Sequence, residues 1–204
     1  MFIRKIFLLI FFLSKFSFSQ EITEISDYAN TITSKELLEN LYVYSSDYFQ
    51  GRETGTIGQK RAANFLRDFY ISSGILSARG TNNYFQPMML NIRGEKVETE
   101  NVAAIIRGVK YPEEYIILSA HLDHIGIDEN GNINNGADDD GSGNVALLEI
   151  AEAFMKAKNE GSGPKRSLVF LHVTGEEKGL LGSKYYTENP LYPLKNTVAN
   201  LNID

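Results

Sequence analysis

The 204-residue chain contains no cysteine and no tryptophan, and only three histidines. Without disulfides, any stability beyond that of an ordinary core has to come from tighter packing or from a bound metal. The missing cysteine also excludes the lipid anchor of a lipoprotein, because that anchor is attached to a cysteine at the cleavage point. Repeats and low-complexity tracts are absent, and the apolar content is ample for a core, which excludes a disordered chain.

The chain also lacks an apolar run long enough to span a membrane, which takes roughly 20 residues. Its strongest run covers 6–13, follows Arg4 and Lys5, and leads to small residues at 17–19. A basic start, a short apolar centre and small residues at a cleavage point are typical of a secretory signal peptide. We therefore expect residues 1–19 to be removed, which leaves a secreted or periplasmic protein with no stable membrane anchor.

Basic residues are fewer than acidic ones, 20 against 26. The net charge is −6, and removal of a signal peptide that carries Arg4, Lys5 and Lys15 lowers it to −9. Binding of nucleic acid depends on clustered lysine and arginine, so we expect no nucleic-acid partner. The remaining length suits one domain, and its oligomeric state stays unknown.

The N-terminal part, residues 20–95, is predicted to be helical. Thr33 and Glu36 have capping-box spacing. The apolar residues that follow recur at helical period, at Leu37, Leu38, Leu41 and Tyr42. A second amphipathic helix over 62–70 is expected to end near Gly74.

Residues 96–204 are predicted to form an α/β metal-binding core. Short β-branched or apolar runs, typical of buried strands, cover 102–106, 115–118, 167–172 and 198–203. A helix with a broad apolar face is predicted over 144–158. Alternating strands and helices imply a three-layer α/β sandwich with a mostly parallel central sheet flanked by helices. Ligands of such sheets bind beyond the carboxyl ends of the strands.

Acids and histidines fall at those ends. His121 and Asp123 follow one strand, and neutral imidazole with carboxylate is the usual ligand set of catalytic zinc. In an extended chain these two side chains point the same way, so the Asp123 carboxylate is placed to accept the second N–H of the imidazole. A surface loop with incidental acids is the competing interpretation. His124 either lines the cleft or faces solvent, and His172, inside an apolar strand, is predicted to be a core histidine.

Three consecutive acids, 138–140, repel one another unless a cation lies among them. A divalent ion explains the run, and calcium also tolerates such a loop. The alternative is a helix start, where acids are favoured by the helix dipole, although one acid is sufficient for that. Glu176 and Glu177 follow the next strand, so one can bind metal while the other takes a proton from water. An ordinary helix start explains this pair as well.

At these residues the sequence resembles the family-28 metallopeptidases, the co-catalytic zinc aminopeptidases. The matching segments are SAHLDH at 119–124, GADDDGSG at 136–143, TGEEKGLLGS at 174–183 and NLNID at 200–204. They occur in the family's order, and GRETG at 51–55 is similar to its N-terminal segment. The resemblance covers the chain from about residue 33 onward.

The resemblance implies a role for each candidate residue. It makes His121, Asp139 and Asp204 the ligands of one zinc ion, with Asp139 bridging to a second. It assigns Glu177 to that second ion. It makes Glu176 the general base and Asp123 the residue that orients His121, and it implies a cis peptide after Asp139.

One departure concerns the second ion. In the family a histidine well after the position of Asp204 completes that site, and this chain ends at Asp204. We therefore expect 20–204 to be an incomplete catalytic domain, truncated at the C-terminus, with its first zinc site complete and its second lacking a ligand.

The resemblance implies an exopeptidase that removes N-terminal residues from extracytoplasmic peptides. A glutaminyl-cyclase-like transferase is an alternative, although those enzymes bind one zinc ion and lack the run of three acids. Carboxypeptidase specificity on the same fold is another. An inactive fragment that acts only as a binding module is the alternative outside enzymes.

Overall fold

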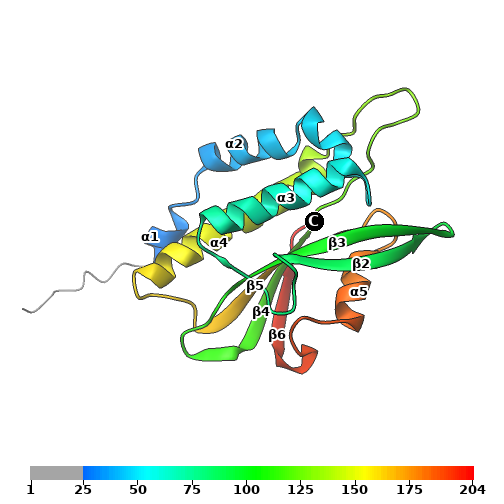
Figure 1. Ribbon diagram of the computed structural model, residues 1–204. Helices are drawn as coiled ribbons and strands as arrows, with labels where there is room; N and C mark the ends of the chain where they lie inside the picture. Colours follow the sequence, from blue (N-terminus) through cyan, green and yellow to red (C-terminus); the bar gives the residue numbers. More distant parts are fainter. Residues whose placement is uncertain (1–24) are drawn as a thin grey trace, which may run out of the picture.

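The computed structural model describes residues 25–204, so the predicted signal peptide over 1–19 lies outside the described residues. The α-helices are α1 (Ile25–Ala29), α2 (Ser34–Tyr44), α3 (Ile57–Ser72), α4 (Gly143–Asn159) and α5 (Leu181–Glu188). The strands are β1 (Leu76–Ser77), β2 (Phe85–Ile92), β3 (Glu95–Ile106), β4 (Tyr111–His121), β5 (Arg166–Val173) and β6 (Thr197–Asn202). Helices α2, α3 and α4 lie on one side of the sheet and α5 on the other (Figure 1).

The sheet is mixed. Its strand order is β1-β3-β5-β4-β6, with β2 paired to β3 from Glu95 to Val102. Strand β4 runs parallel to both β5 and β6, whereas β3 pairs antiparallel with β5, β1 and β2. The predicted three-layer α/β class is confirmed, and the parallel pairing is confined to the half of the sheet where the acids and histidines lie.

The segment before residue 95 is helical only as far as Ser72. Strands β2 and β3 form a hairpin that pairs Ile92 with Glu95 across two residues. These two, Arg93 and Gly94, have φ angles of 53° and 92°, the left-handed conformation that two-residue hairpin turns require. Burial along β2 alternates, which is the pattern of a strand with one solvated face.

Helix α2 begins at the predicted capping box. Thr33 Oγ1 accepts a hydrogen bond from the Glu36 amide at 3.2 Å and donates one to the Glu36 carboxylate. Leu37 and Leu41, one turn apart, pack against the core. Leu38 and Tyr42, predicted on the same apolar side, are instead 65% and 80% exposed because they lie about 100° further round the helix.

The sheet has a core on each face, because successive strand residues point to opposite sides. Val102, Ala104 and Ile106 of β3 pack under α3 and α4, whereas Ala103 and Ile105 pack toward α5. Strand β5 is buried on both faces. The carboxyl ends of β4, β5 and β6 are therefore held in fixed relative positions.

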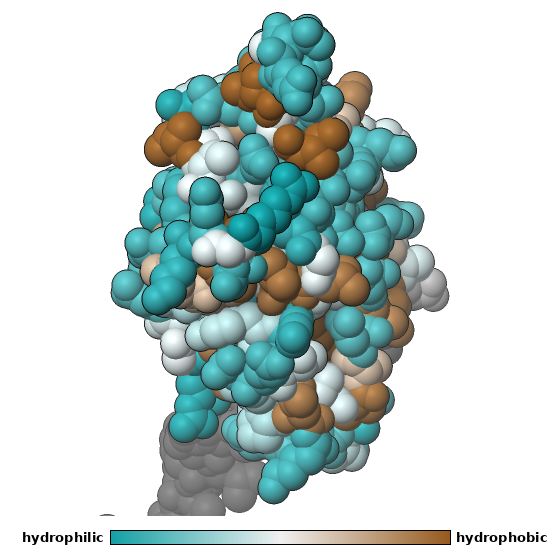
Figure 2. All heavy atoms as spheres, turned by 90° about the vertical axis from the view of Figure 1, so that its right-hand side faces the viewer, coloured by the Kyte–Doolittle hydropathy of each residue, from teal (hydrophilic) through white to brown (hydrophobic). Residues whose placement is uncertain are grey.

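Within residues 25–204, no helix is both long enough and apolar enough to cross a membrane. Exposed apolar side chains occur, for example Met89 at 57% and Ile125 at 48%. On the side of the molecule shown in Figure 2, apolar residues are interspersed with hydrophilic ones. Scattered exposure of this kind is ordinary for a folded protein surface.

Candidate metal centre

Three strand ends converge on one group of side chains. Strand β4 lies between β5 and β6 and runs parallel to both, so their carboxyl ends meet at one edge. His121 ends β4, and its Nε2 lies 3.0 Å from Asp139 Oδ1 and 3.6 Å from Asp204 Oδ1. The structure thus brings together three residues that are up to 83 positions apart in the sequence.

A second group adjoins the first. His124 Nδ1 lies 2.9 Å from Glu177 Oε1 and 3.8 Å from Asp139 Oδ2. His124 is only 9% exposed, so it lines the site and does not face solvent. Asp139 belongs to both groups, with one carboxylate oxygen toward each histidine.

Both groups fit a zinc ion. Each contains one imidazole and two carboxylates, the donor types of catalytic zinc sites, and the ligand atoms of each group lie within 4.8 Å of one another. Lys178, which directly follows Glu177 in the sequence, forms an ion pair with Glu53 at 2.8 Å. Among the ion pairs of residues 25–204, none joins a lysine or arginine to Asp139, Glu177 or Asp204, so a cation is the natural compensation for their charge.

The three consecutive acids have three different environments. Asp138 is exposed, and Asp139 faces the two histidines. Asp140 is 1% exposed, and its carboxylate accepts hydrogen bonds from the amides of His121 (2.9 Å) and Gly143 (3.0 Å). Burial raises the pKa of Asp140 to about 6. Both explanations of the run therefore apply, since Asp140 caps α4 while Asp139 is free for a metal; the peptide between them is cis.

Asp123 orients His121 differently from the prediction. The Nδ1 atom of His121 lies 3.0 Å from the main-chain oxygen of Asp123 but 3.9 Å from its carboxylate, which is too far for a hydrogen bond. The chain leaves the strand conformation at Leu122, so the alternation expected of an extended segment does not hold. A carbonyl can only accept, so Nδ1 carries a proton, and Nε2 is the ring atom that faces Asp139 and Asp204.

The Asp123 carboxylate positions Glu176. Its Oδ1 accepts the Glu176 amide at 3.1 Å, and its Oδ2 accepts the Thr54 hydroxyl at 2.7 Å. Burial raises the pKa of Glu176, and Glu177 and the other carboxylates of the site raise it further against the opposing effect of His121. A carboxyl group with a raised pKa suits a residue that accepts and then returns a proton.

His121 is influenced by the same carboxylates. Burial lowers the pKa of its imidazole, but the charges of Asp140, Asp123 and Glu176 outweigh that effect and raise the pKa overall. The side chain is only 3% exposed. A cationic or metal-bound imidazole is therefore favoured at this position.

His172 is a core residue, as predicted. It is fully buried, and burial lowers the pKa of its imidazole to about 3. Its Nε2 lies 2.7 Å from the Tyr70 hydroxyl and its Nδ1 lies 2.6 Å from Asn144 Oδ1. The Asn144 amide in turn donates to the main-chain oxygens of His121 and Asp140. His172 therefore helps to position these two residues through its contact with Asn144.

Arg52 is a site residue for which sequence reasoning gave no role. It is fully buried, and its guanidinium donates to the main-chain oxygens of Leu122 (3.1 Å), Asn135 (2.7 Å) and Gly136 (2.7 Å). It thereby fixes the loop of His121 against the loop of Asp139. Gly136 has a φ of 56°, and a β-carbon there would lie 2.5 Å from the Asp139 oxygen, so this approach requires glycine.

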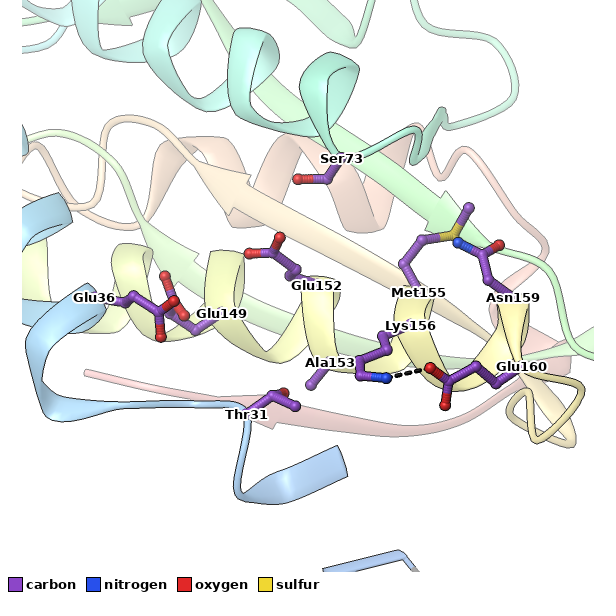
Figure 3. A pocket seen from close by; sticks show the side chains of 10 residues that line it. All are labelled: Thr31, Glu36, Ser73, Glu149, Glu152, Ala153, Met155, Lys156, Asn159 and Glu160. Atoms are coloured by element: carbon purple, nitrogen blue, oxygen red, sulfur yellow. Dashed lines mark hydrogen bonds and ion pairs between the residues drawn. The ribbon is translucent and has the colours of Figure 1, made fainter. Parts of the chain in front are cut away.

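The helical side of the molecule has a separate hollow of about 450 Å³. Glu36 of α2 and Glu149 and Glu152 of α4 line it, and Lys156 pairs with Glu160 at its rim (Figure 3). Burial raises the pKa of Glu149, whose carboxylate accepts a hydrogen bond from Asn40. None of the candidate ligands lines this hollow, so it is not part of the metal centre.

Comparisons with known proteins point to one family of peptidases. The sequence model of Peptidase family M28 matches residues 101–204. A probable leucine aminopeptidase of Arthroderma benhamiae is 34% identical over 146 residues, which are 68% of this chain and 40% of the relative. A probable glutamate carboxypeptidase of Arabidopsis thaliana is 35% identical over 123 residues, which are 58% of this chain and 17% of the relative.

Solved structures share the fold. A Zn-dependent exopeptidase from Parabacteroides distasonis superposes with a TM-score of 0.64 and 22% identity, over 81% of this chain and 60% of that one. The glutaminyl cyclase of Porphyromonas gingivalis gives a TM-score of 0.69 and 22% identity, over 84% and 60%. The chain thus spans less than half the length of the two relatives and about three fifths of these structures.

Proposed function

The chain belongs to peptidase family M28, and from that premise we propose that it carries the metal centre of a zinc-dependent exopeptidase that removes N-terminal residues from peptides outside the cytoplasm. The observation that carries the proposal is the convergence of His121, Asp139 and Asp204 beside Glu176, at the carboxyl ends of parallel strands. The substrate class is peptide. Nucleic acid is not proposed as a partner, because the chain carries a net charge of −6.

The zinc centre is proposed on the two side-chain groups. His121, Asp139 and Asp204 hold the first ion, and Asp139 and Glu177 face a second position. Bound zinc supplies Lewis acidity toward the scissile carbonyl and lowers the pKa of water near it to about 7. His121 Nδ1 donates its proton in a hydrogen bond to the Asp123 carbonyl, which keeps Nε2 available as a ligand atom.

Glu176 is the proposed general base. Its carboxyl group accepts the proton of the attacking water and returns it to the nitrogen of the broken peptide bond, which becomes the new N-terminal amine of the shortened peptide. The hydrogen bond from its amide to Asp123 fixes the main chain at this position, and the neighbouring Glu177 is thereby directed to the second group. Two adjacent glutamates thus have separate tasks, one as base and one as ligand.

Peptide hydrolysis is tested with aminoacyl-p-nitroanilides and zinc-loaded protein. We expect zinc-dependent release of nitroaniline, and Glu176→Ala should lower kcat/KM by about 10²- to 10⁴-fold because it removes the base. The matched control is Glu188→Ala at the exposed end of α5, which should leave the rate unchanged. No cleavage by the metal-loaded protein, or cleavage that is unaffected by Glu176→Ala, would end the proposal.

Two further substrates separate the alternatives on this fold. Peptides blocked at the N-terminus but free at the C-terminus are cleaved by a carboxypeptidase and resist an aminopeptidase. Peptides that begin with glutamine are cyclised, without loss of a residue, by a glutaminyl cyclase. The run of Asp138, Asp139 and Asp140 counts against a glutaminyl cyclase, so we expect no cyclisation, and the blocked peptides decide between an aminopeptidase and a carboxypeptidase.

A further inference from the structure

Lys178 carries a positive charge next to the two glutamates that the proposed function uses. It directly follows Glu177 in the sequence, and its ammonium group pairs with Glu53 at 2.8 Å. We propose that Glu53 is a positioning residue of the metal centre, whose carboxylate holds Lys178 away from the carboxylates of Glu176 and Glu177. Those two carboxylates then stay free for the roles of base and ligand. The inference rests on the proposed function and adds one residue to it.

Glu53 is fixed beside the loop of His124. The two residues form a parallel β-bridge, and the His124 amide donates to the Arg52 oxygen at 3.3 Å. The side chain of Glu53 lies over Gly126, where an added β-carbon would come within 2.7 Å of Glu53 Oε2. A carboxylate packed this closely has little freedom to follow the lysine elsewhere. The ion pair is therefore held at the position of Glu53.

The turn that carries Glu176 and Glu177 does not need the ion pair for its shape. The main-chain oxygen of Glu176 accepts the amides of Gly179 at 2.8 Å and Leu180 at 3.0 Å, and the Glu176 amide donates to Asp123. An ion pair whose side chains are 19% and 38% exposed contributes little to stability. The effect of Glu53 is therefore expected in the location of the lysine charge and not in folding.

Without the Glu53 carboxylate, Lys178 has two other acceptors next to it in the sequence. Glu176 and Glu177 are the two residues before it, and among the ion pairs of residues 25–204 neither has a lysine or arginine partner. The lysine ammonium is a compact charge on a flexible four-carbon stem, so it can turn toward either carboxylate. An ammonium group bound there occupies an oxygen that a metal ion or the proton of a water molecule requires.

The competing role for Glu53 is that of a negative charge that attracts zinc from a distance. In that case, removal of the charge weakens zinc binding whether or not a lysine is present at residue 178. If Glu53 instead restrains Lys178, its removal weakens zinc binding only while the lysine is there to bind the freed carboxylates. The two roles thus differ in whether the effect of Glu53 depends on Lys178.

A double-mutant cycle measures this dependence. The zinc affinities of Glu53→Gln, Lys178→Met and the double variant are determined by calorimetric titration of the metal-free proteins. We expect Glu53→Gln to bind zinc about 3- to 10-fold more weakly than the unchanged protein, and the double variant to bind it as tightly as Lys178→Met. A double variant that is weaker than Lys178→Met by the same factor would overturn the inference.

The matched control is Glu114→Gln. Glu114 lies at the opposite end of β4 from His121, and its carboxylate pairs with Arg166 in an ion pair that is also partly exposed. This variant loses the same charge as Glu53→Gln but frees no lysine beside the glutamates, so we expect it to bind zinc as the unchanged protein does. Equal weakening in Glu114→Gln and Glu53→Gln would contradict a specific role for Glu53.

The position of Lys178 is a second readout, and it needs no zinc. In a crystal structure of metal-free Glu53→Gln, we expect Lys178 Nζ to lie about 3 Å from a carboxylate oxygen of Glu176 or Glu177. An ammonium group that points into solvent, or that stays beside residue 53, would overturn the inference. If the unchanged protein binds no zinc, the proposed function fails, and the position of Lys178 in this variant still decides the role of Glu53.

Discussion

The carboxylate of Asp123 accepts a hydrogen bond from the main-chain amide of Glu176, with 3.1 Å between Oδ1 and N. The other oxygen accepts the Thr54 hydroxyl. Asp123 is fully buried, so these bonds are not exchanged with water. One side chain thus joins the end of β4, the segment after β5 and the segment that precedes α3, and the position of the proposed base depends on it.

Asp123→Asn is expected to weaken both stability and activity. The amide offers one acceptor where two donors now bind, so one buried donor loses its partner, at a cost of about 1–3 kcal/mol. We expect the free energy of unfolding, measured in urea, to fall by that amount, and kcat to fall more than KM rises. Thr54→Val is the matched control, since it removes only the Thr54 bond and leaves that of Glu176. Equal kcat values in Asp123→Asn and Thr54→Val would contradict the positioning role.

Arg52→Lys is expected to loosen both metal-binding loops. The planar guanidinium donates to main-chain oxygens on two loops at once, which one ammonium group does not reproduce. Several buried carbonyls then lose donors, so we expect a loss of about 2–5 kcal/mol in unfolding free energy and weaker zinc binding. Arg61→Lys on half-buried α3 surface is the comparison, because Arg61 donates one exposed hydrogen bond to the Tyr48 oxygen and lies over the Tyr48 ring. Similar stability of the two variants would count against the role given to Arg52.

The pH dependence of stability should carry a contribution from His172. Its pKa is about 3 in the folded protein and about 6.5 in the unfolded chain, so unfolding takes up a proton between these values. The stabilising contribution of the neutral imidazole is complete above about pH 6.5 and is lost as the pH falls toward 3. We expect the unfolding free energy to decrease from this source by about 1.4 kcal/mol per pH unit in that window.

Two variants isolate this effect from the other titrating groups. His172→Gln should be less stable at pH 7 but should show a shallower decline between pH 6.5 and 5. Tyr70→Phe removes the hydrogen bond to Nε2 but keeps the imidazole, so it should retain the steep decline. A decline in His172→Gln as steep as in the unchanged protein would show that His172 is not the source.

Local patterns were sufficient to predict the elements that place the site. Strands β4, β5 and β6 are apolar runs followed by acids or histidines, and α4 follows the glycines around Asp139. Because parallel strands end at one edge, the convergence of His121, Asp139 and Asp204 was a consequence of the predicted fold class. For the three-acid run the two competing explanations each describe one residue, since Asp140 caps a helix and Asp139 faces the histidines.

Contacts between distant segments could not be predicted from local sequence patterns. Arg52 lies 70 residues before Leu122 and 84 before Gly136, and a local pattern carries no signal for a buried arginine that donates to their carbonyls. The prediction that the Asp123 carboxylate accepts the N–H of His121 depends on an extended chain, whereas the chain leaves the strand conformation at Leu122. Strand β2 was missed because its sequence, FQPMMLNI, contains a proline and does not alternate regularly between apolar and polar residues.

The most direct test of the metal centre compares two adjacent acids, Asp138 and Asp139. Asp138 is exposed and belongs to neither ligand group, whereas Asp139 belongs to both. Metal-free Asp138→Ala and Asp139→Ala are titrated with zinc by calorimetry under the same conditions as the unchanged protein. We predict that Asp138→Ala binds zinc as the unchanged protein does and that Asp139→Ala loses tight binding; equal binding by the two variants would contradict the account.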